Sequence, residues 1–292
     1  MNRKLAVAVM VAAAAGSWAA AQTQLNERKA AAPDGAVEIS NVSGSVRVIG
    51  WDRGEVEVTG TLGRGSERLE FSGAPGRTVV KVILPRHAHD VDGSDLTVRV
   101  PAGSRLEVDT VSADVEADGL RAEVEVETVS GTIRVAEGPS GVRAASVSGD
   151  VEVAAAGPVR AKSVSGTITV RGASRTFEAA SVSGAIRATV GTVESAELET
   201  TSGSIRFEGD VAKNGRLEAK TMSGSAVVTL PASLGAEYTV KTFSGDIDNE
   251  LGPAARRTSE YGPGRELDFT TGDGGARVRV TSFSGSVTLR KR

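Results

Sequence analysis

Two histidines and a group of aspartates are the first residues in this chain that could do chemistry. The segment 86–95 reads RHAHDVDGSD and holds the only histidines of the sequence. On an extended strand His87 and His89 would share one face, with Asp90 and Asp92 nearby. Imidazole and carboxylate groups bind divalent metals, so these four residues are a candidate metal site. The plainer interpretation is a solvated polar loop, because the segment lacks the closing glutamate of a twelve-residue calcium loop.

Other catalytic arrangements find little support in the residue types. Cysteine chemistry is excluded because the chain has no cysteine. A serine hydrolase needs a base beside an activated serine, and two histidines without a G-x-S-x-G elbow do not supply a triad. Glycine-rich stretches such as GPGREL do not follow the strand-to-helix plan of a phosphate loop. We therefore expect no catalytic residue, no cofactor and no enzymatic activity.

A glycan-cleaving β-helix is the enzymatic alternative, and it would need clustered carboxylates on one face. Charges at equivalent positions of the chain instead alternate in sign, as in Glu125/Arg143 and Arg160/Glu178. Such mixed pairs are typical of a solvated surface. Under this alternative, the site would lie around His87 or in the irregular segment that precedes the last repeat.

The elements that position these residues follow from a repeated Ser-Gly step. Between Ser112 and Ser244 its serine recurs at intervals of 17 to 21 residues. Apolar residues alternate on both sides of the step, as in VEVETVSGTIRV at 124–135, which predicts two short strands per repeat. The apolar parity changes across Ser-Gly, so the chain must bend there, and glycine permits the bend.

We predict that these residues form a structural corner ladder. Each serine, with its preceding Ser or Thr neighbour, can bond backbone groups at the corner or the matching hydroxyl one coil away. The alternative is a row of exposed serines that binds or reacts. The predicted ladder comprises Ser43, Ser112, Ser130, Ser148, Ser165, Ser183, Ser202, Ser223, Ser244, Ser284, Gly131, Gly149, Gly166, Gly184, Gly203, Gly224, Gly245 and Gly285.

Two strands and two corners make one coil, and stacked coils make a solenoid. The predicted fold class is all-β: a single-domain parallel β-solenoid, β-helix-like, of about 18–21-residue coils with a less regular β N-terminal cap. One coil cannot fold alone, because ordering about 18 residues costs on the order of 18–36 kcal/mol of backbone freedom. Its inward apolar side chains contribute only about 10 kcal/mol, so the array must fold together.

The ends of the chain suggest its organisation. Residues 1–21 follow the plan of a secretory signal peptide, with Arg3 and Lys4 before an apolar run and small residues before Gln22. No transmembrane segment is expected after signal cleavage. Arg290–Arg292 follow the last strand and would discourage another strand from adding to an open edge. The predicted parts are a flexible mature N-terminus (22–36) and a solenoid domain (37–292), divided into cap coils (37–101), regular coils (102–248), an insertion or hairpin (249–275) and the last coil (276–292).

Three phrases, with serial VSGxI units between them, carry a family resemblance: NVSGSVRVIGWDRGEVEVTG, LTVRVPAGSRLEVDTVSADVEA and RVTSFSGSVTLRKR. Over about residues 37–292 the chain resembles the bacterial putative-adhesin β-strand repeat family, an exported family classed as a domain of unknown function. The resemblance implies a β-solenoid domain without established catalytic residues.

These observations together predict a non-enzymatic exported protein of the cell envelope, located in the periplasm or at the cell surface. It would present a β-solenoid surface for adhesion, or for binding an unknown protein or glycan partner. Two alternatives stay open: a polysaccharide-active β-helix enzyme, and a periplasmic accessory in envelope stress sensing. Nucleic acid is not an expected partner, because the net charge is −3 and no continuous basic stripe is present.

Overall fold

The computed structural model describes residues 23–74, 76–86, 91–136, 138–154, 157–172, 175–258 and 263–292. Within these ranges the regular secondary structure consists of strands alone, which confirms the predicted all-β class. The described part of the chain has no helix that is long and apolar enough to cross a membrane. The strands are β1 (Thr23–Ala30), β2 (Ala36–Trp51), β3 (Glu55–Leu62), β4 (Arg68–Ala74), β5 (Arg77–Ile83), β6 (Ser94–Pro101), β7 (Arg105–Asp118), β8 (Glu123–Thr128), β9 (Ile133–Val135), β10 (Gly141–Ser146), β11 (Val151–Ala154), β12 (Val159–Ser163), β13 (Ile168–Arg171), β14 (Arg175–Ser181), β15 (Ile186–Thr200), β16 (Ile205–Ser223), β17 (Ala226–Leu230), β18 (Ala236–Ser244), β19 (Ile247–Asn249), β20 (Arg256–Arg257), β21 (Arg265–Thr270), β22 (Ala276–Ser284) and β23 (Val287–Lys291).

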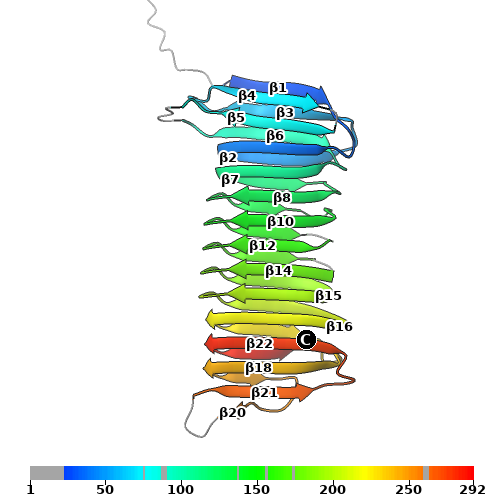
Figure 1. Ribbon diagram of the computed structural model, residues 1–292, viewed down its shortest axis with the longest axis vertical. Helices are drawn as coiled ribbons and strands as arrows, with labels where there is room; N and C mark the ends of the chain where they lie inside the picture. The colour runs from blue at the N-terminus through cyan, green and yellow to red at the C-terminus, as the bar shows by residue number, and fades with distance from the viewer. Residues whose placement is uncertain are drawn as a thin grey trace, which may run out of the picture.

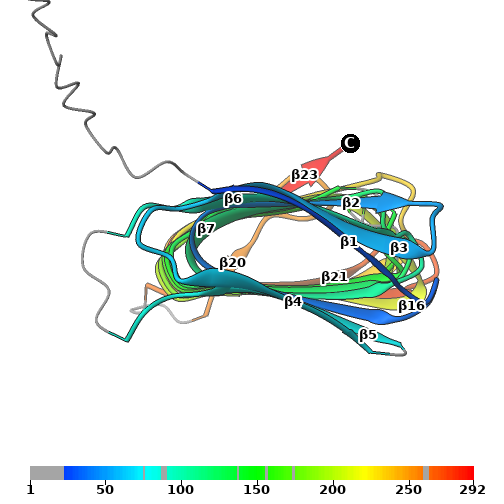
Figure 2. The same ribbon diagram turned by 90° about the horizontal axis from the view of Figure 1, so that it is seen from above.

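The strands lie above one another along the long axis of the molecule (Figure 1). Viewed along this axis, they form two facing layers joined at two corners (Figure 2). In one layer β8, β10, β12 and β14 pair in parallel, and in the other β9, β11, β13 and β15 do so. Val142 is the register partner of both Val124 and Val159, which are 18 and 17 residues away. We call each turn of the chain with a strand in both layers a rung.

The two layers enclose an aliphatic core. Along each strand buried and outward residues alternate, so that Val124 and Val126 of β8 and Ile133 of β9 are fully buried. Few aromatic rings are needed, and Phe177 and Phe207 stack within the core with ring centroids 6.3 Å apart. Complete burial contributes roughly 1.5–3 kcal/mol for each large aliphatic or aromatic side chain, which offsets the ordering of the rungs.

The N-terminal end departs from the regular pattern. β1 pairs with β3, and β3 with β6, in antiparallel fashion, while β4 and β5 form an antiparallel hairpin. Residues 22–36 were predicted to be flexible, yet 23–30 form β1 and pair with β3 along their whole length. Leu25 is buried there and the strand covers the edge of β3, which gives this segment both apolar and backbone partners.

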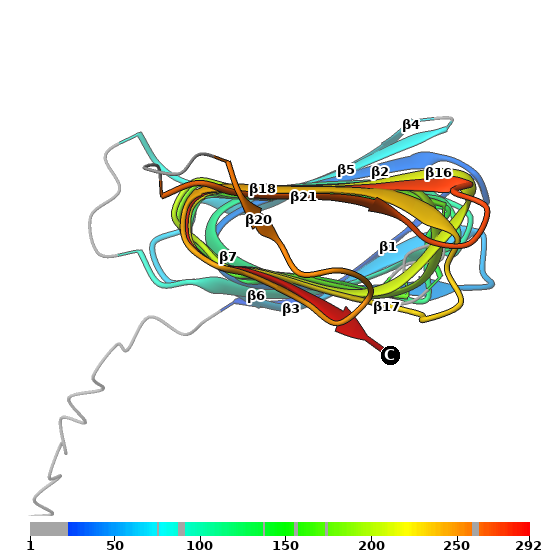
Figure 3. The same cartoon turned by 90° about the horizontal axis from the view of Figure 1, so that it is seen from below.

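At the C-terminal end the order of the rungs differs from the order of the sequence. β22 pairs in parallel with β16 on one side and with β18 on the other, and β23 lies likewise between β17 and β19. β21 then pairs antiparallel with β18, and β20 with β21, at the far end of the stack (Figure 3). The predicted open edge is wrong for 287–289, which pair with both β17 and β19, whereas Arg290 and Lys291 pair with β17 alone.

Candidate functional site

At the Ser-Gly corner the buried hydroxyl belongs to the residue two positions before the serine. Thr200 Oγ1 accepts a hydrogen bond from the Gly203 N–H at 3.0 Å and donates to the Gly184 carbonyl of the neighbouring rung at 3.3 Å. Acceptance by a Ser or Thr hydroxyl from the glycine N–H recurs at Thr128–Gly131, Ser146–Gly149, Ser163–Gly166 and Ser181–Gly184. These bonds tie each corner to itself and to the adjacent rung.

The serines of the predicted ladder lie on the outer side of the same corner. Ser43 is the register partner of Ser112, and Ser284 is the partner of both Ser223 and Ser244. From Ser112 onward their side chains are exposed to solvent. Their backbone carries a structural contact, since the N–H of a serine reaches back one rung, as from Ser130 to the Val111 carbonyl at 2.8 Å, and the same bond recurs at Ser148, Ser165, Ser183, Ser202 and Ser223.

The glycine after the serine is required by the close approach of the rungs. A Cβ on Gly166 would lie 1.9 Å from the carbonyl oxygen of Gly149. The same distance recurs at Gly131, Gly149, Gly184 and Gly203. A positive φ adds a second requirement for glycine at Gly44, with φ +104°, and at Gly224, Gly245 and Gly285, with φ between +153° and +158°.

The residues immediately before the serines form a line of outward apolar side chains, which we call the apolar column. Their exposed fractions run from 37% at Val42 to 60% at Met222, and Phe243 and Phe283 stack with ring centroids 4.9 Å apart. All exposed large hydrophobic residues of the described chain belong to this column. In stack order its members are Val42, Val111, Val129, Val147, Val164, Val182, Met222, Phe283 and Phe243, with Thr201 between Val182 and Met222.

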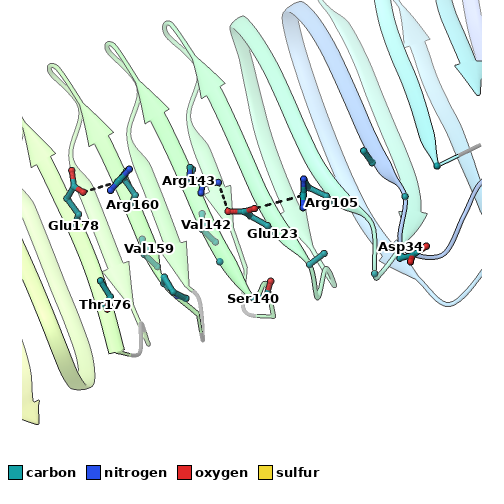
Figure 4. A pocket seen from close by; sticks show the side chains of 17 residues that line it. Asp34, Arg105, Glu123, Ser140, Val142, Arg143, Val159, Arg160, Thr176 and Glu178 are labelled. Carbon is teal, nitrogen blue, oxygen red and sulfur yellow. Dashed lines mark hydrogen bonds and ion pairs between the residues drawn. The ribbon is translucent and has the colours of Figure 1, made fainter. Parts of the chain in front are cut away.

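A groove runs along the corner opposite the apolar column, where β8, β10, β12 and β14 begin (Figure 4). Its volume is about 830 Å³, and it extends from the N-terminal strands to β14. Small residues at the strand starts leave its floor open, including Gly35, Gly103 and Gly141. A Cβ on Gly141 would meet only the Pro158 carbonyl oxygen at 3.6 Å, so this floor has room for a side chain.

Arginine and glutamate side chains of successive rungs form the wall of the groove (Figure 4). Glu123 forms ion pairs with Arg105 at 4.0 Å and with Arg143, and Arg160 Nε donates to Glu178 Oε2 at 2.8 Å. The carboxylates are thus paired with guanidinium groups of neighbouring rungs. This wall offers alternating hydrogen-bond donors and acceptors.

One group of like charges lies beside this wall. Partial desolvation raises the pKa of the Glu107 carboxyl, and the neighbouring carboxylates of Glu38, Asp109 and Glu125 raise it further. Glu38, Glu107 and Glu125 are register neighbours in β2, β7 and β8. Like charges directly opposite one another on neighbouring strands are destabilising, so this column of carboxylates opposes the stacking of the first regular rungs.

The metal candidates receive no support from the described residues. His87, His89 and Asp90 lie outside the described residues, whereas Asp92 Oδ2 accepts a hydrogen bond from Arg64 Nε at 2.6 Å. Among the residues that the structure describes, no group of three or more His, Cys, Asp or Glu could hold a metal ion.

The irregular segment 249–275, the other place considered for an enzymatic site, contributes to the end of the stack. Its strand β21 covers β18 over six residue pairs. Glu266 of β21 forms an ion pair with Lys241 of β18 at 3.0 Å, and Arg265 with Asp246 at 2.7 Å. Within its described part, these charges serve the attachment of β21 to the last rung.

The family model described as Toastrack DUF4097 matches residues 69–196 and 174–290. The chain belongs to this family. The match confirms the resemblance to a putative-adhesin domain of unknown function that the VSG phrases suggested. In this Toastrack chain the matched residues include the apolar column from Val111 to Phe283 and the strands β8 to β14 that border the groove.

Three solved structures are similar to the Toastrack chain. A putative cell adhesion protein from Clostridium sporogenes is 10% identical with a TM-score of 0.23, over 92% of this chain and 100% of its own. Putative adhesins from Bacteroides fragilis and Parabacteroides distasonis are 10% and 11% identical, each with a TM-score of 0.44 over 91% of this chain and 97% of their own. At these values the likeness carries no argument about function. The comparison with curated proteins gave no match.

Proposed function

We propose that this Toastrack chain is a non-enzymatic protein of the cell envelope or cell surface, exported by residues 1–21. Its described residues would form a rigid parallel β-solenoid that presents a binding surface for adhesion or for an envelope partner. The groove is the observation that carries this proposal. It combines a floor of small residues with a wall of paired Arg and Glu side chains over several rungs.

The chemistry of the groove favours an extended, polar and uncharged ligand. The Arg and Glu side chains of the wall balance one another, so long-range attraction of a charged partner is weak. Paired guanidinium and carboxylate groups still offer donors and acceptors at each rung, spaced about 4.8 Å apart. A glycan chain or an extended peptide can use such a periodic series of hydrogen-bond partners.

Blocking the groove without disturbing the rungs tests the proposal. In Gly141→Arg the Cβ has room, so the side chain would fill the groove. Gly191→Arg is the matched control, because nothing lies within 4 Å of its Cβ and it does not line the groove. Mature protein (residues 22–292) would be used to capture partners from native envelope extracts and on glycan arrays.

We expect a partner that binds the mature protein and the Gly191→Arg variant, and whose binding to Gly141→Arg is at least about tenfold weaker, equivalent to 1.4 kcal/mol. Equal binding by both variants would reject the groove as the binding site. The absence of any envelope, cell or glycan partner above background would reject the proposed function itself.

A further inference from the structure

We propose that the apolar column is the interface through which two copies of this chain associate, side by side and antiparallel. This inference does not depend on the proposed function, since the column lies at the corner opposite the groove. It follows from the area of the column, from the gradient of side-chain size along it and from the charges beside it.

The area of the column suits a partner protein. Its nine apolar side chains are all more than a third exposed, and they lie in one line over ten rungs, about 43 Å long. Together they expose on the order of 700 Å², more than the largest apolar patch of a typical monomer. A stable interface buries about 800 Å² on each partner, an area that the column reaches together with its polar flanks.

The size of the side chains changes along the column, and this gradient selects an antiparallel arrangement. Valines occupy the N-terminal rungs, while Met222, Phe283 and Phe243 occupy the C-terminal ones. In an antiparallel pair the Phe243 end meets the Val42 end of the second copy, so large side chains face small ones along the line. A parallel pair would set Phe against Phe and hold the valine ends apart.

One pair of charges beside the column is complementary in the same arrangement. The residue two positions before each column residue points outward from the layer that contains β8. We call these residues the flank. In stack order its charged members are Asp109, Glu127, Lys162, Glu199, Lys220 and Lys241. Counted from Val42, Val129 lies on the third rung and Met222 on the eighth. A two-fold axis between the rungs of Val164 and Val182 sets these two rungs opposite each other, so Glu127 faces Lys220 of the second copy.

A parallel pair would instead bring the flank against the opposite side of the corner. Asp109 would then face Asp114 of the second copy, a repulsive contact, whereas Lys241 would face Asp246, so the gradient of side-chain size decides between the two arrangements. Lys220 and Lys241 now pair with Glu218 at 2.9 Å and with Glu266 at 3.0 Å. Both groups of the Lys241–Glu266 pair are exposed, and such pairs contribute only about 0–1 kcal/mol, so Lys241 can exchange partners at little cost.

The geometry of the two exposed rings disfavours a sugar as the occupant. Phe243 and Phe283 are stacked with ring planes 7° apart, so that each ring covers a face of the other. A sugar packs against an open aromatic face, and in each of these residues one face is covered by the other ring. Edges of Phe, together with Val and Met methyl groups, fit the apolar side chains of another protein surface.

Single cysteines test the interface, because the natural chain has none. Val164→Cys and Val182→Cys lie next to the proposed two-fold axis, within about 5 Å along the column of their symmetry mates. Each should therefore give a covalent dimer with a short bismaleimide. Val42→Cys lies at the end of the column, far from its symmetry mate, and should not be cross-linked, although it would be cross-linked in a parallel pair. The variants keep the buried residues intact, and circular dichroism would verify their fold.

Sedimentation of the mature protein provides the second measurement. We expect a dimer, and we expect Phe243→Ser/Phe283→Ser to raise the dissociation constant at least about tenfold, whereas Gly191→Arg leaves it unchanged. A wild-type protein that stays monomeric up to about 100 µM, well above the dissociation constant of a stable interface, would overturn the proposal. Cross-linking of Val42→Cys as efficient as that of Val164→Cys would overturn the antiparallel arrangement.

Discussion

Replacement of Thr200 by valine isolates the contribution of the buried corner hydroxyl. Valine keeps the size and the β-branched shape of threonine, so the core packing changes little. The substitution removes the acceptor of the Gly203 N–H at 3.0 Å and the donor to the Gly184 carbonyl at 3.3 Å. Gly203 is buried, and a buried N–H without a partner costs about 1–3 kcal/mol.

We therefore expect Thr200→Val to lower the free energy of unfolding by about 1–3 kcal/mol in urea titrations followed by circular dichroism. The melting temperature should fall by roughly 2–12 °C, at about 2–4 °C per kcal/mol for a chain of this size. Ser202→Ala is the matched control, because this hydroxyl is exposed, and its effect should stay within about 0.5 kcal/mol. Equal stability of Thr200→Val and wild type, or an equal loss in Ser202→Ala, would refute the reasoning.

Two further predictions concern the packing and the charges of the rungs. Gly166→Ala should destabilise the fold by at least about 3 kcal/mol, because its Cβ would lie 1.9 Å from the Gly149 carbonyl oxygen. Gly191→Ala, with open space around its Cβ, should be neutral in the same urea titration, and a tolerated Gly166→Ala would contradict the close approach. For Glu107 the folded-state pKa is raised by desolvation and by Glu38, Asp109 and Glu125, so its ionisation destabilises the folded state above that pKa. Glu107→Gln should therefore increase stability at pH 7 by roughly 0.2–1 kcal/mol and give no gain at about pH 3, where the unfolded carboxyl is also protonated. A gain of equal size at both pH values would show that the charge is not its cause.

The inward positions could be predicted from the sequence because apolar residues alternate with period two along each strand, and the parity of this alternation changes at a glycine. Val126 and Ile133 are buried on either side of Gly131, as that pattern requires. The change of parity indicates a bend at the glycine, but it does not reveal how closely the neighbouring rung approaches. The 1.9 Å approach to the neighbouring rung depends on which rung lies beside it, and one repeat read alone does not contain that information.

The order of the last rungs could not be predicted for a related reason. Val278 has a buried register partner on each side, Leu217 and Tyr238, and its strand fits any neighbour that shares its pattern. Sequence order suggested that β18 would follow β16. The 249–275 segment is long enough to carry the chain outward and back, so β22 takes the place between them.

The candidate surfaces were missed because they depend on what aligns across rungs. Val129 is out of phase with Val126, and this phase indicates an outward side chain. The groove arises where small residues such as Gly35, Gly103 and Gly141 come into line at the strand starts. An absent side chain gives no signal until the stacking of the rungs is known.

Disulfide formation between register partners tests the parallel stacking of the rungs most directly, because the natural chain has no cysteine. Glu218 of β16 is the register partner of Arg279 of β22, and Arg279 is the partner of Thr239 of β18. Adjacent strands lie about 4.8 Å apart, within the Cα separation that a disulfide bridges, whereas a distance of two rungs, about 9.6 Å, exceeds it. We predict that Glu218→Cys/Arg279→Cys oxidises to a disulfide in the folded protein and that Glu218→Cys/Thr239→Cys does not. A disulfide in the second variant with none in the first would contradict the stack described here.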